Sequence, residues 1–137
     1  MRNGTYYYLF EQANENYKNI QCGIYPAQVQ EVFYNQYECI LNISLIYWDD
    51  NAKSFKGIIS KYYFQNDSSR TKSISMLAPV FAFYGINLDK IGFEMSTGVL
   101  IDSVNKLKQH IVLMSVTVDS SDGKTFKNVR LKPYSSN

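Results

Sequence analysis

Aromatic and basic side chains occur together at three places in this sequence. These places hold Trp48, Lys53, Phe55 and Lys56; then Lys61 and Tyr63; then Lys124, Phe126, Arg130 and Lys132. Flat rings can stack on unpaired bases at roughly 1–3 kcal/mol each, while lysine and arginine contact phosphates. This combination would bind single-stranded nucleic acid with little sequence preference, because stacking reads no hydrogen-bond code. In the alternative reading, the rings pack a hairpin tip or the core and the lysines are ordinary solubilising charges.

The sequence contains no motif for nucleophilic catalysis, for a nucleotide-binding P-loop or for a metal site. His110 is the only histidine, and no Gly-x-Ser-x-Gly turn accompanies it, so nucleophilic catalysis is not expected. The run Gly123-Lys124-Thr125 looks like the end of a P-loop, but Val118 stands where the first glycine is required. Asp49 and Asp50 lack further spaced carboxylates, and two cysteines cannot complete a zinc site. We therefore expect no enzyme activity, no metal and no cofactor.

Composition and charge limit the class of protein. The chain has 137 residues, of which 45% are hydrophobic, so one domain with a substantial core is expected. The net charge is only +2, but residues 1–50 carry two basic and six acidic side chains, whereas residues 51–137 carry twelve and six. Residues 51–137, which have a net charge of +6, can supply a basic patch that attracts phosphates. The twelve tyrosines suit wet interfaces and β-strands equally well.

No targeting or membrane segment is visible in the sequence. The first residues lack the apolar region and cleavage site of a signal peptide. The longest apolar run, residues 76–86, is shorter than the about 20 residues needed to cross a bilayer. Cys22 and Cys39 do not form a disulfide framework of the secreted kind. We expect a soluble protein in the reducing cytoplasm, without a membrane partner.

A long hairpin over residues 39–65 would position the first two groups. Its first arm alternates apolar residues with Asn42 and Ser44, which is typical of a half-buried strand. Residues 49–53 form a polar turn, and residues 58–65 are rich in β-branched and aromatic side chains. The apolar face holds Cys39, Leu41, Ile43, Leu45 and Tyr47. The opposite face, which we expect to be wetter, holds Ile46, Trp48, Lys61 and Tyr63.

Three further strands are predicted. The first covers Gly23–Tyr34, where the alternation slips after Gln30 and favours a bulge, and Pro26 confines its end to an edge or a strand start. The other two cover residues 111–118 and 125–132, joined by a turn over residues 119–124 that contains the Asp-Gly hairpin signal.

Helices are predicted in three segments. The main one opens at Asn66 and ends near Gly85, with an apolar stripe that includes Leu77 and Phe81. Pro79 should kink this helix or begin a second one. Shorter helices are predicted over residues 5–19 and 97–107, where three consecutive tyrosines and a Val-Leu-Ile run, respectively, would also suit strands.

The order of elements is three strands, a helix and two strands. It fits a mainly β fold, a five-stranded OB-like barrel with a helix between strands 3 and 4. Residues 1–137 would form this one domain, with a short N-terminal helical extension. In such barrels the middle strands and their flanking loops form the binding face. Another small α+β fold would also accommodate the pattern.

Short motifs in a fixed order add a resemblance. They are G-x-Y-x-A from Gly23, Lys56-Gly57, F-x-x-x-G-I from Phe81, and G-K-x-x-x-x-V-x-x-x-P from Gly123. Over residues 20–133 the chain resembles the phage-encoded OB-fold single-stranded DNA-binding proteins. The resemblance implies a protein that coats single strands in replication, recombination or repair, as an oligomer, in the host cytoplasm. The sequence ends in PYSSN, whereas many of those proteins recruit partners through an acidic tail.

The expected partners follow from this reading. They are single-stranded DNA, with RNA as an alternative ligand, further copies of the chain, and replication or recombination proteins. A different class of function stays open: a protein–protein module, such as an inhibitor, adaptor or virion component, that uses a tyrosine-rich surface.

Overall fold

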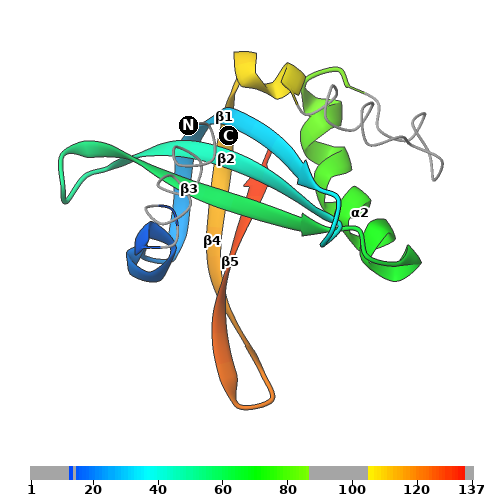
Figure 1. Cartoon of the computed structure of the whole chain (residues 1–137). Helices are drawn as coiled ribbons and strands as arrows, with labels where there is room; N and C mark the ends of the chain where they lie inside the picture. Colours follow the sequence, from blue (N-terminus) through cyan, green and yellow to red (C-terminus); the bar gives the residue numbers. More distant parts are fainter. Residues whose placement is uncertain (1–12, 14, 87–104, 135–137) are drawn as a thin grey trace.

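The structure is a computed structural model that describes residues 13, 15–86 and 105–134. Within these residues, five antiparallel strands form one sheet in the order β3-β2-β1-β4-β5. The strands are β1 (Gly23–Asn35), β2 (Ile40–Asp49), β3 (Ser54–Tyr63), β4 (Ile111–Ser121) and β5 (Lys124–Lys132). Helix α2 (Asp67–Phe83) and the short 3-10 helix η2 (Lys106–Gln109) lie between β3 and β4 in the chain (Figure 1).

The sheet curls until its two edge strands, β3 and β5, meet. The Ser60 hydroxyl donates to the Val129 carbonyl at 2.6 Å, and the Leu131 N–H donates to the Tyr62 hydroxyl at 2.9 Å. No backbone ladder joins β3 to β5 in the described strands, so side chains close this line, which we call the seam. The fold is a mainly β, five-stranded OB-like barrel with a helix between the third and fourth strands, as predicted.

The predicted inner face of the long hairpin is confirmed from Leu41 to Tyr47. Two residues differ: Cys39 precedes β2 and is only half-buried, and Asn42, predicted on the wetter face, is buried. Leu41, Ile43 and Leu45 of β2 are fully buried, whereas Lys61 and Tyr63 of β3 are exposed. Because side chains alternate across a strand, these two sets mark the inside and the outside of the barrel. The turn between the strands is held by the Asp49 carboxylate, which accepts from the N–H groups of residues 51 and 52 at 2.9 and 3.2 Å.

The irregularity predicted in β1 is also present. The pairing of β1 with β2 shifts between Val29 and Glu31, where a bulge was expected. Pro26 lies opposite Leu113 of β4, and the pairing with β2 begins only at Ala27. Pro26 therefore sits where β1 has a neighbour on one side only, which is where a residue without an N–H is tolerated.

The β4–β5 hairpin is longer than predicted. Only Asp122 and Gly123 form the turn, both with positive φ, whereas the sequence predicted a turn over residues 119–124. A two-residue turn of this kind needs no more than the Asp-Gly pair, so the ladder continues outward through Ser121 and Lys124. The result is a two-stranded ribbon that projects from the barrel (Figure 1).

Helix α2 covers one end of the barrel. Asn66 caps it in a capping box with Ser69, and Gly85, at φ +80°, follows its end. The helix runs unbroken through Pro79, so the alternative of a second helix beginning there is wrong. Of the other predicted helices, residues 13 and 15–19 are helical and Asn105 precedes η2. The remaining parts of both predictions lie outside the described residues.

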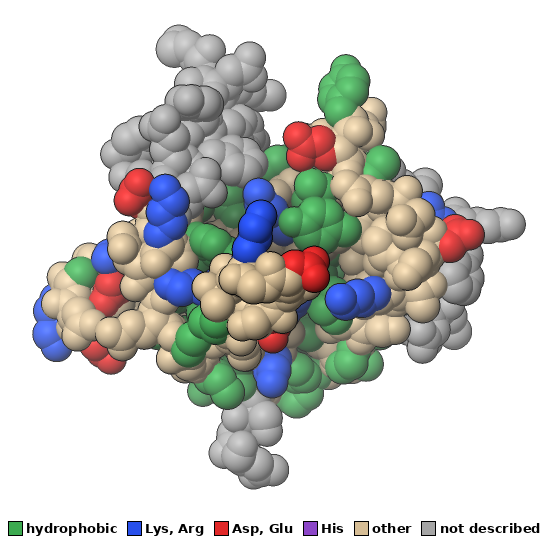
Figure 2. Space-filling view, turned by 90° about the horizontal axis from the view of Figure 1, so that it is seen from below, with side chains coloured by type: hydrophobic (Ala, Val, Ile, Leu, Met, Phe, Trp, Pro, Cys, Tyr) green, Lys and Arg blue, Asp and Glu red, His purple; other side chains and the backbone are tan. Residues whose placement is uncertain are grey.

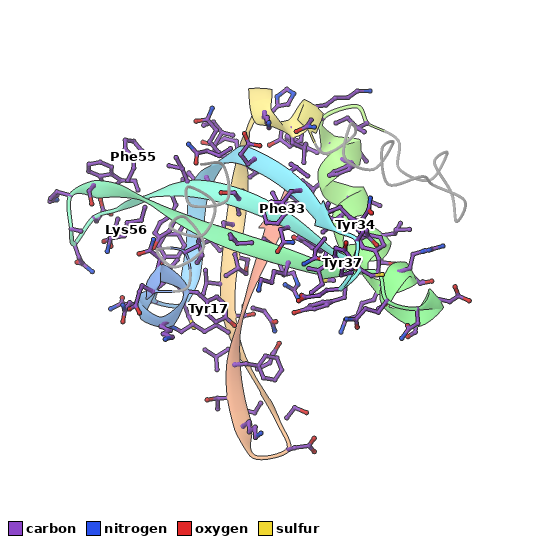
Figure 3. All side chains as sticks on the ribbon, viewed as in Figure 1. Tyr17, Phe33, Tyr34, Tyr37, Phe55 and Lys56 are labelled. Carbon is purple, nitrogen blue, oxygen red and sulfur yellow. The ribbon has the colours of Figure 1, made fainter. Side chains whose placement is uncertain are left out.

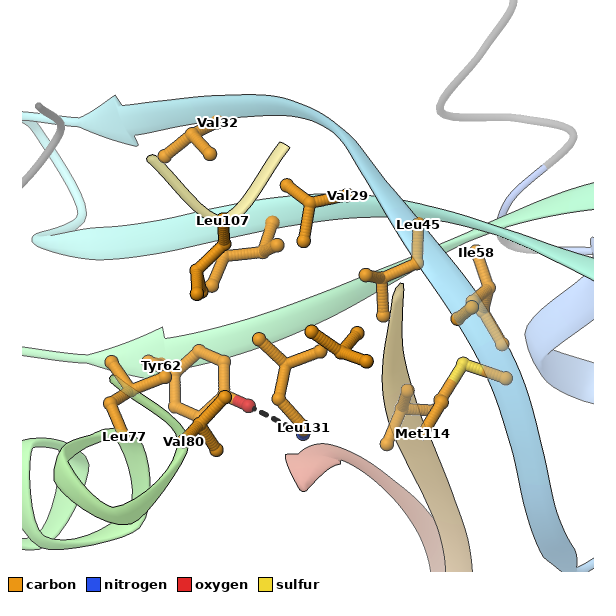
Figure 4. Packing of buried hydrophobic residues seen from close by; sticks show 14 of the residues in the cluster. Val29, Val32, Leu45, Ile58, Tyr62, Leu77, Val80, Leu107, Met114 and Leu131 are labelled. Atoms are coloured by element: carbon orange, nitrogen blue, oxygen red, sulfur yellow. Dashed lines mark hydrogen bonds between the residues drawn. The ribbon is translucent and has the colours of Figure 1, made fainter. Parts of the chain in front are cut away.

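The core fills the barrel and continues into α2. Figure 4 shows Leu77 and Val80 of α2 beside Tyr62 of β3 and Leu131 of β5. All four side chains are at most 4% exposed. Tyr62 combines an apolar ring with a hydroxyl that reaches the backbone of β5, so one residue joins the core to the seam.

Buried tyrosines predict a loss of stability in alkali. Burial, helped by the nearby Asp49 carboxylate, raises the pKa of Tyr47 to about 12, and burial also raises the pKa of Tyr62. These pKa values are higher in the folded state than the ordinary value near 10. The contribution of these neutral tyrosines to the free energy of unfolding is therefore complete below about pH 10. It is lost as the pH rises toward about 12.

Urea unfolding at a series of alkaline pH values tests this expectation. The free energy of unfolding should fall across that window in the wild type. It should fall less in Tyr47→Phe, which cannot ionise at this position. Equal slopes for the two proteins would show that Tyr47 does not contribute.

Candidate nucleic-acid interface

A groove of about 730 Å³ lies along the seam. Its floor is the outer face of the two edge strands, because inward-facing residues such as Ser60 and Tyr62 alternate with outward-facing ones. The floor residues are Ile59, Lys61 and Tyr63 from β3 and Phe126, Asn128 and Arg130 from β5. Four residues predicted from the sequence therefore come together here: Lys61, Tyr63, Phe126 and Arg130.

Helix α2 forms one wall of the groove. Its contributing residues are Ser69, Lys72, Ser73 and Met76, which follow the i, i+3, i+4, i+7 spacing of one helix face. The buried Ser73 hydroxyl donates to the Tyr63 carbonyl at 2.6 Å and fixes this face against β3. Lys72 is not among the site residues predicted from the sequence. The polar stripe beside the apolar stripe of α2 was the signal that could have identified it.

The helical residues 15–19 form the other wall of the groove and are hydrogen-bonded to both edge strands. The Asn16 side chain donates to the Gly57 carbonyl of β3, and the Tyr17 hydroxyl donates to the Lys127 carbonyl of β5. The Lys127 ammonium donates in return to the Lys18 and Ile20 carbonyls at 2.8 and 2.6 Å. Tyr17 lies between the helical residues and the barrel in Figure 3 and lines the groove.

Arg130 mainly makes contacts that join α2 and β3 to its own strand β5 across the seam. Its Nε contacts the Met76 sulfur at 3.2 Å, and one terminal nitrogen donates to the Val129 and Lys61 carbonyls at 3.0 and 3.4 Å. Its guanidinium carbon lies 5.5 Å from the centre of the Tyr62 ring, a cation–π distance. These contacts tie α2, β3 and β5 together, so Arg130 holds the groove in shape and contributes its charge.

The groove carries a positive charge. Four lining residues are basic (Lys61, Lys72, Lys127 and Arg130) and one is acidic (Asp119), which gives a formal charge of +3. Asp119 accepts a hydrogen bond from the Asn128 side chain. Within the described ranges, the Lys61 and Lys72 ammonium groups have neither a hydrogen-bond nor an ion-pair partner, and both residues are exposed. Figure 2 shows basic side chains interspersed with hydrophobic ones on the end from which the β4–β5 ribbon projects.

Two aromatic rings on the groove floor are open to solvent. Tyr63 on β3 is 42% exposed and Phe126 on β5 is 45% exposed. Each comes from a different edge strand, so the rings lie on the two sides of the seam. Exposed rings in a groove that also holds lysines are the kind of side chain on which unpaired bases stack.

The hairpin tip forms a second aromatic pair, outside the groove. The Trp48 and Phe55 rings meet edge to face with centres 4.9 Å apart, and they are 43% and 69% exposed. The Trp48 indole N–H donates to the Asp50 carboxylate at 2.8 Å, which fixes the ring. Figure 3 shows Phe55 on the β2–β3 hairpin, away from the body of the barrel.

Of the two basic residues at the hairpin tip, Lys56 forms an ion pair and Lys53 lies exposed in the turn. Lys56 is paired with Asp49 at 2.8 Å, and this contact, with the N–H of Ala52, holds the pKa of the Asp49 carboxyl below its usual value. Lys53 is exposed in the turn, with φ +54°.

Lys124 and Lys132 are exposed at opposite ends of β5 and do not line the groove. Six predicted residues therefore lie outside it: Trp48, Lys53, Phe55, Lys56, Lys124 and Lys132.

Sites for other chemistry are not apparent in the described part of the chain. Among residues 13, 15–86 and 105–134, no cluster of His, Cys, Asp and Glu could hold a metal ion. Cys22 and Cys39 are free thiols. His110 stacks on the Tyr84 ring with centres 4.4 Å apart. None of the described helices is long and apolar enough to span a membrane.

The chain matches no protein-family model, and no curated protein matches it. Neither comparison supports the resemblance noted in the sequence.

Proposed function

We propose that the groove along the seam binds single-stranded DNA with little sequence preference. The observation that carries this proposal is the pairing of two half-exposed rings, Tyr63 and Phe126, with the exposed Lys61 and Lys72 in a groove of charge +3. Bases would stack on the rings while the backbone follows the lysines. Arg130 and Lys127 would contribute mainly to the field that attracts the strand.

The path of the strand can extend beyond the groove. Phe55 lies on the same outward face of β3 as Lys61 and Tyr63, since all three have the same parity along the strand. At about 3.3 Å per residue, Phe55 is about 26 Å from Tyr63 along β3. A strand that leaves the groove in this direction would reach the Trp48–Phe55 pair, and OB-folds bind about 4–16 nucleotides.

The biological setting of the proposal comes from the sequence resemblance. The protein would coat single strands in phage-type replication, recombination or repair, in the host cytoplasm and without catalysis. RNA would fit the same groove, because neither stacking nor phosphate contact requires the absence of a 2′-hydroxyl.

Fluorescence anisotropy with a labelled oligo-dT tests the proposal. Binding is expected at low salt, and the logarithm of the affinity should fall linearly with the logarithm of the salt concentration. An oligo-dT that does not bind at low salt would refute the proposal and favour a protein–protein module. Quenching of Trp48, the only tryptophan, would show separately whether the hairpin tip touches the strand.

The double variant Lys61→Gln/Lys72→Gln should bind oligo-dT more weakly and with a shallower salt dependence. Each neutralised phosphate contributes about −0.7 to the log–log slope on single strands, so losing two contacts should reduce its magnitude by about 1.4. Lys106→Gln/Lys108→Gln on η2 is the matched control, because it changes the net charge equally and Lys108 makes only an exposed 3.8 Å ion pair. Equal slopes for the two double variants would place the phosphate path elsewhere.

A further inference from the structure

The groove contains one negative charge, the Asp119 carboxylate, among the described residues that line it. A carboxylate weakens the attraction of a groove for phosphates, because both groups are negative. Its place in an otherwise basic groove is therefore unfavourable for contact with the backbone of a nucleic acid. The favourable contact that remains for a carboxylate is with a base, whose edge can carry N–H donors.

The pairing of β4 with β5 places this carboxylate beside one of the two exposed rings of the groove. Asp119 is the direct partner of Phe126 in the ladder. Opposed residues of an antiparallel pair direct their side chains to the same face, with Cβ atoms about 4.5–5.5 Å apart. Both residues line the groove. A base stacked on the Phe126 ring would therefore have its edge near the Asp119 carboxylate.

A chain of hydrogen bonds orients the carboxylate. The Asn128 side chain donates to Oδ2 of Asp119, and its own oxygen accepts from the Arg130 guanidinium at 3.4 Å. Arg130 is held in turn by the Met76 sulfur at 3.2 Å. In the described part of the chain, no hydrogen bond or ion pair engages the other oxygen of Asp119, Oδ1. Oδ1 is therefore an oriented acceptor that a ligand can use.

The bases differ in what they can offer to such an acceptor. An ionised carboxylate accepts hydrogen bonds and donates none. Cytosine, adenine and guanine each carry an exocyclic amino group, and aspartate is a known acceptor for the N4 amino group of cytosine. Thymine and uracil carry the carbonyl oxygen O4 at the position of that amino group, so they would bring two acceptors together.

We propose that Asp119 is a specificity-determining residue that makes the groove favour bases with an amino group, cytosine among the pyrimidines, over thymine and uracil. The preference rests on the proposed function, because it concerns a base stacked on Phe126. Thymine keeps its stacking and phosphate contacts, so oligo-dT stays a ligand of lower affinity.

Anisotropy titration of the full chain with labelled oligo-dC and oligo-dU of equal length, at one salt concentration and neutral pH, tests this preference. A homopolymer presents the same base to Phe126 in every register. A hydrogen bond to a charged group is worth about tenfold or more in affinity, and less where water competes, so oligo-dC should bind at least about fivefold more tightly. Equal affinities would overturn the preference and leave single-strand binding intact. If neither oligomer binds at low salt, the proposed function fails and the preference with it.

Asp119→Asn separates recognition of the base from the effect of charge. Asp119 is exposed, and an asparagine can still accept from Asn128, but its amide also donates to O4 of uracil. The ratio of the oligo-dC to oligo-dU affinities should therefore fall to about one.

Asp122→Asn in the β4–β5 turn is the matched control for this variant. It removes the same charge outside the groove, and asparagine tolerates the φ of +54° at this position. Its affinity ratio should equal that of the wild type. An unchanged ratio in Asp119→Asn, or an equal fall in both variants, would show that Asp119 acts only through its charge and would overturn the proposal.

Discussion

The double variant Tyr63→Ala/Phe126→Ala is expected to lose about 2–6 kcal/mol of binding free energy for oligo-dT, or about 30-fold to about 10⁴-fold in affinity. Each ring supplies one stacking platform, and each platform is worth roughly 1–3 kcal/mol by alanine substitution. The rings are nearly half exposed, so their removal should leave the core intact. Anisotropy titration at constant salt measures the change, because salt alone shifts the affinity strongly.

A matched variant separates stacking from a general loss of aromatic surface. Tyr37→Ala/Phe83→Ala also removes one tyrosine and one phenylalanine, which are 100% and 54% exposed and lie outside the groove. It should bind oligo-dT as the wild type does. If both double variants weaken binding to the same extent, the two groove rings have no special part in it.

Phe81→Ala is expected to lower the free energy of unfolding by about 3–5 kcal/mol, a large fraction of the stability of a small domain. Phe81 is fully buried near the end of α2 and belongs to the same core cluster as Leu77 and Tyr62. Truncating it leaves a cavity that surrounding side chains fill only partly. Urea unfolding followed by circular dichroism gives the difference.

The same helix offers its own control for this prediction. Phe83 is two residues further on and 54% exposed, so Phe83→Ala should cost less than about 1 kcal/mol. Similar losses for the two variants would mean that α2 does not anchor the core through Phe81. A large loss for Phe81→Ala alone supports the packing of α2 over the end of the barrel.

The local parts of the fold could be predicted from local patterns. The alternation from Leu41 to Tyr47 identified the buried side of β2, and the slip after Gln30 marked the bulge in β1. Period-2 alternation and turn chemistry act over a few residues, so the sequence shows them directly. The β4–β5 turn was predicted too long, because Asp119-Ser120-Ser121 has a turn-like composition although the Asp-Gly pair makes the turn alone.

The groove depends on contacts that no local pattern reveals. Ser60 and Val129 lie 69 positions apart, and only the curl of the sheet brings β3 beside β5. The alternation predicted correctly that Lys61 and Tyr63 face outward, but it could not show that Phe126 of β5 lines the same groove. For the same reason Arg130 was predicted to contact phosphate, while the structure shows most of its donors engaged by Met76, Val129 and Lys61.

An amide chemical-shift titration of the folded chain with oligo-dT tests the central claim most directly. The groove predicts the largest shifts in residues 59–63 of β3 and 126–130 of β5, with smaller ones in the α2 wall around Lys72. Residues of β1 and β4, which do not line the groove except at Asp119, should change little. Shifts confined to β1 and β4, or none at low salt, would contradict binding of a single strand along the seam.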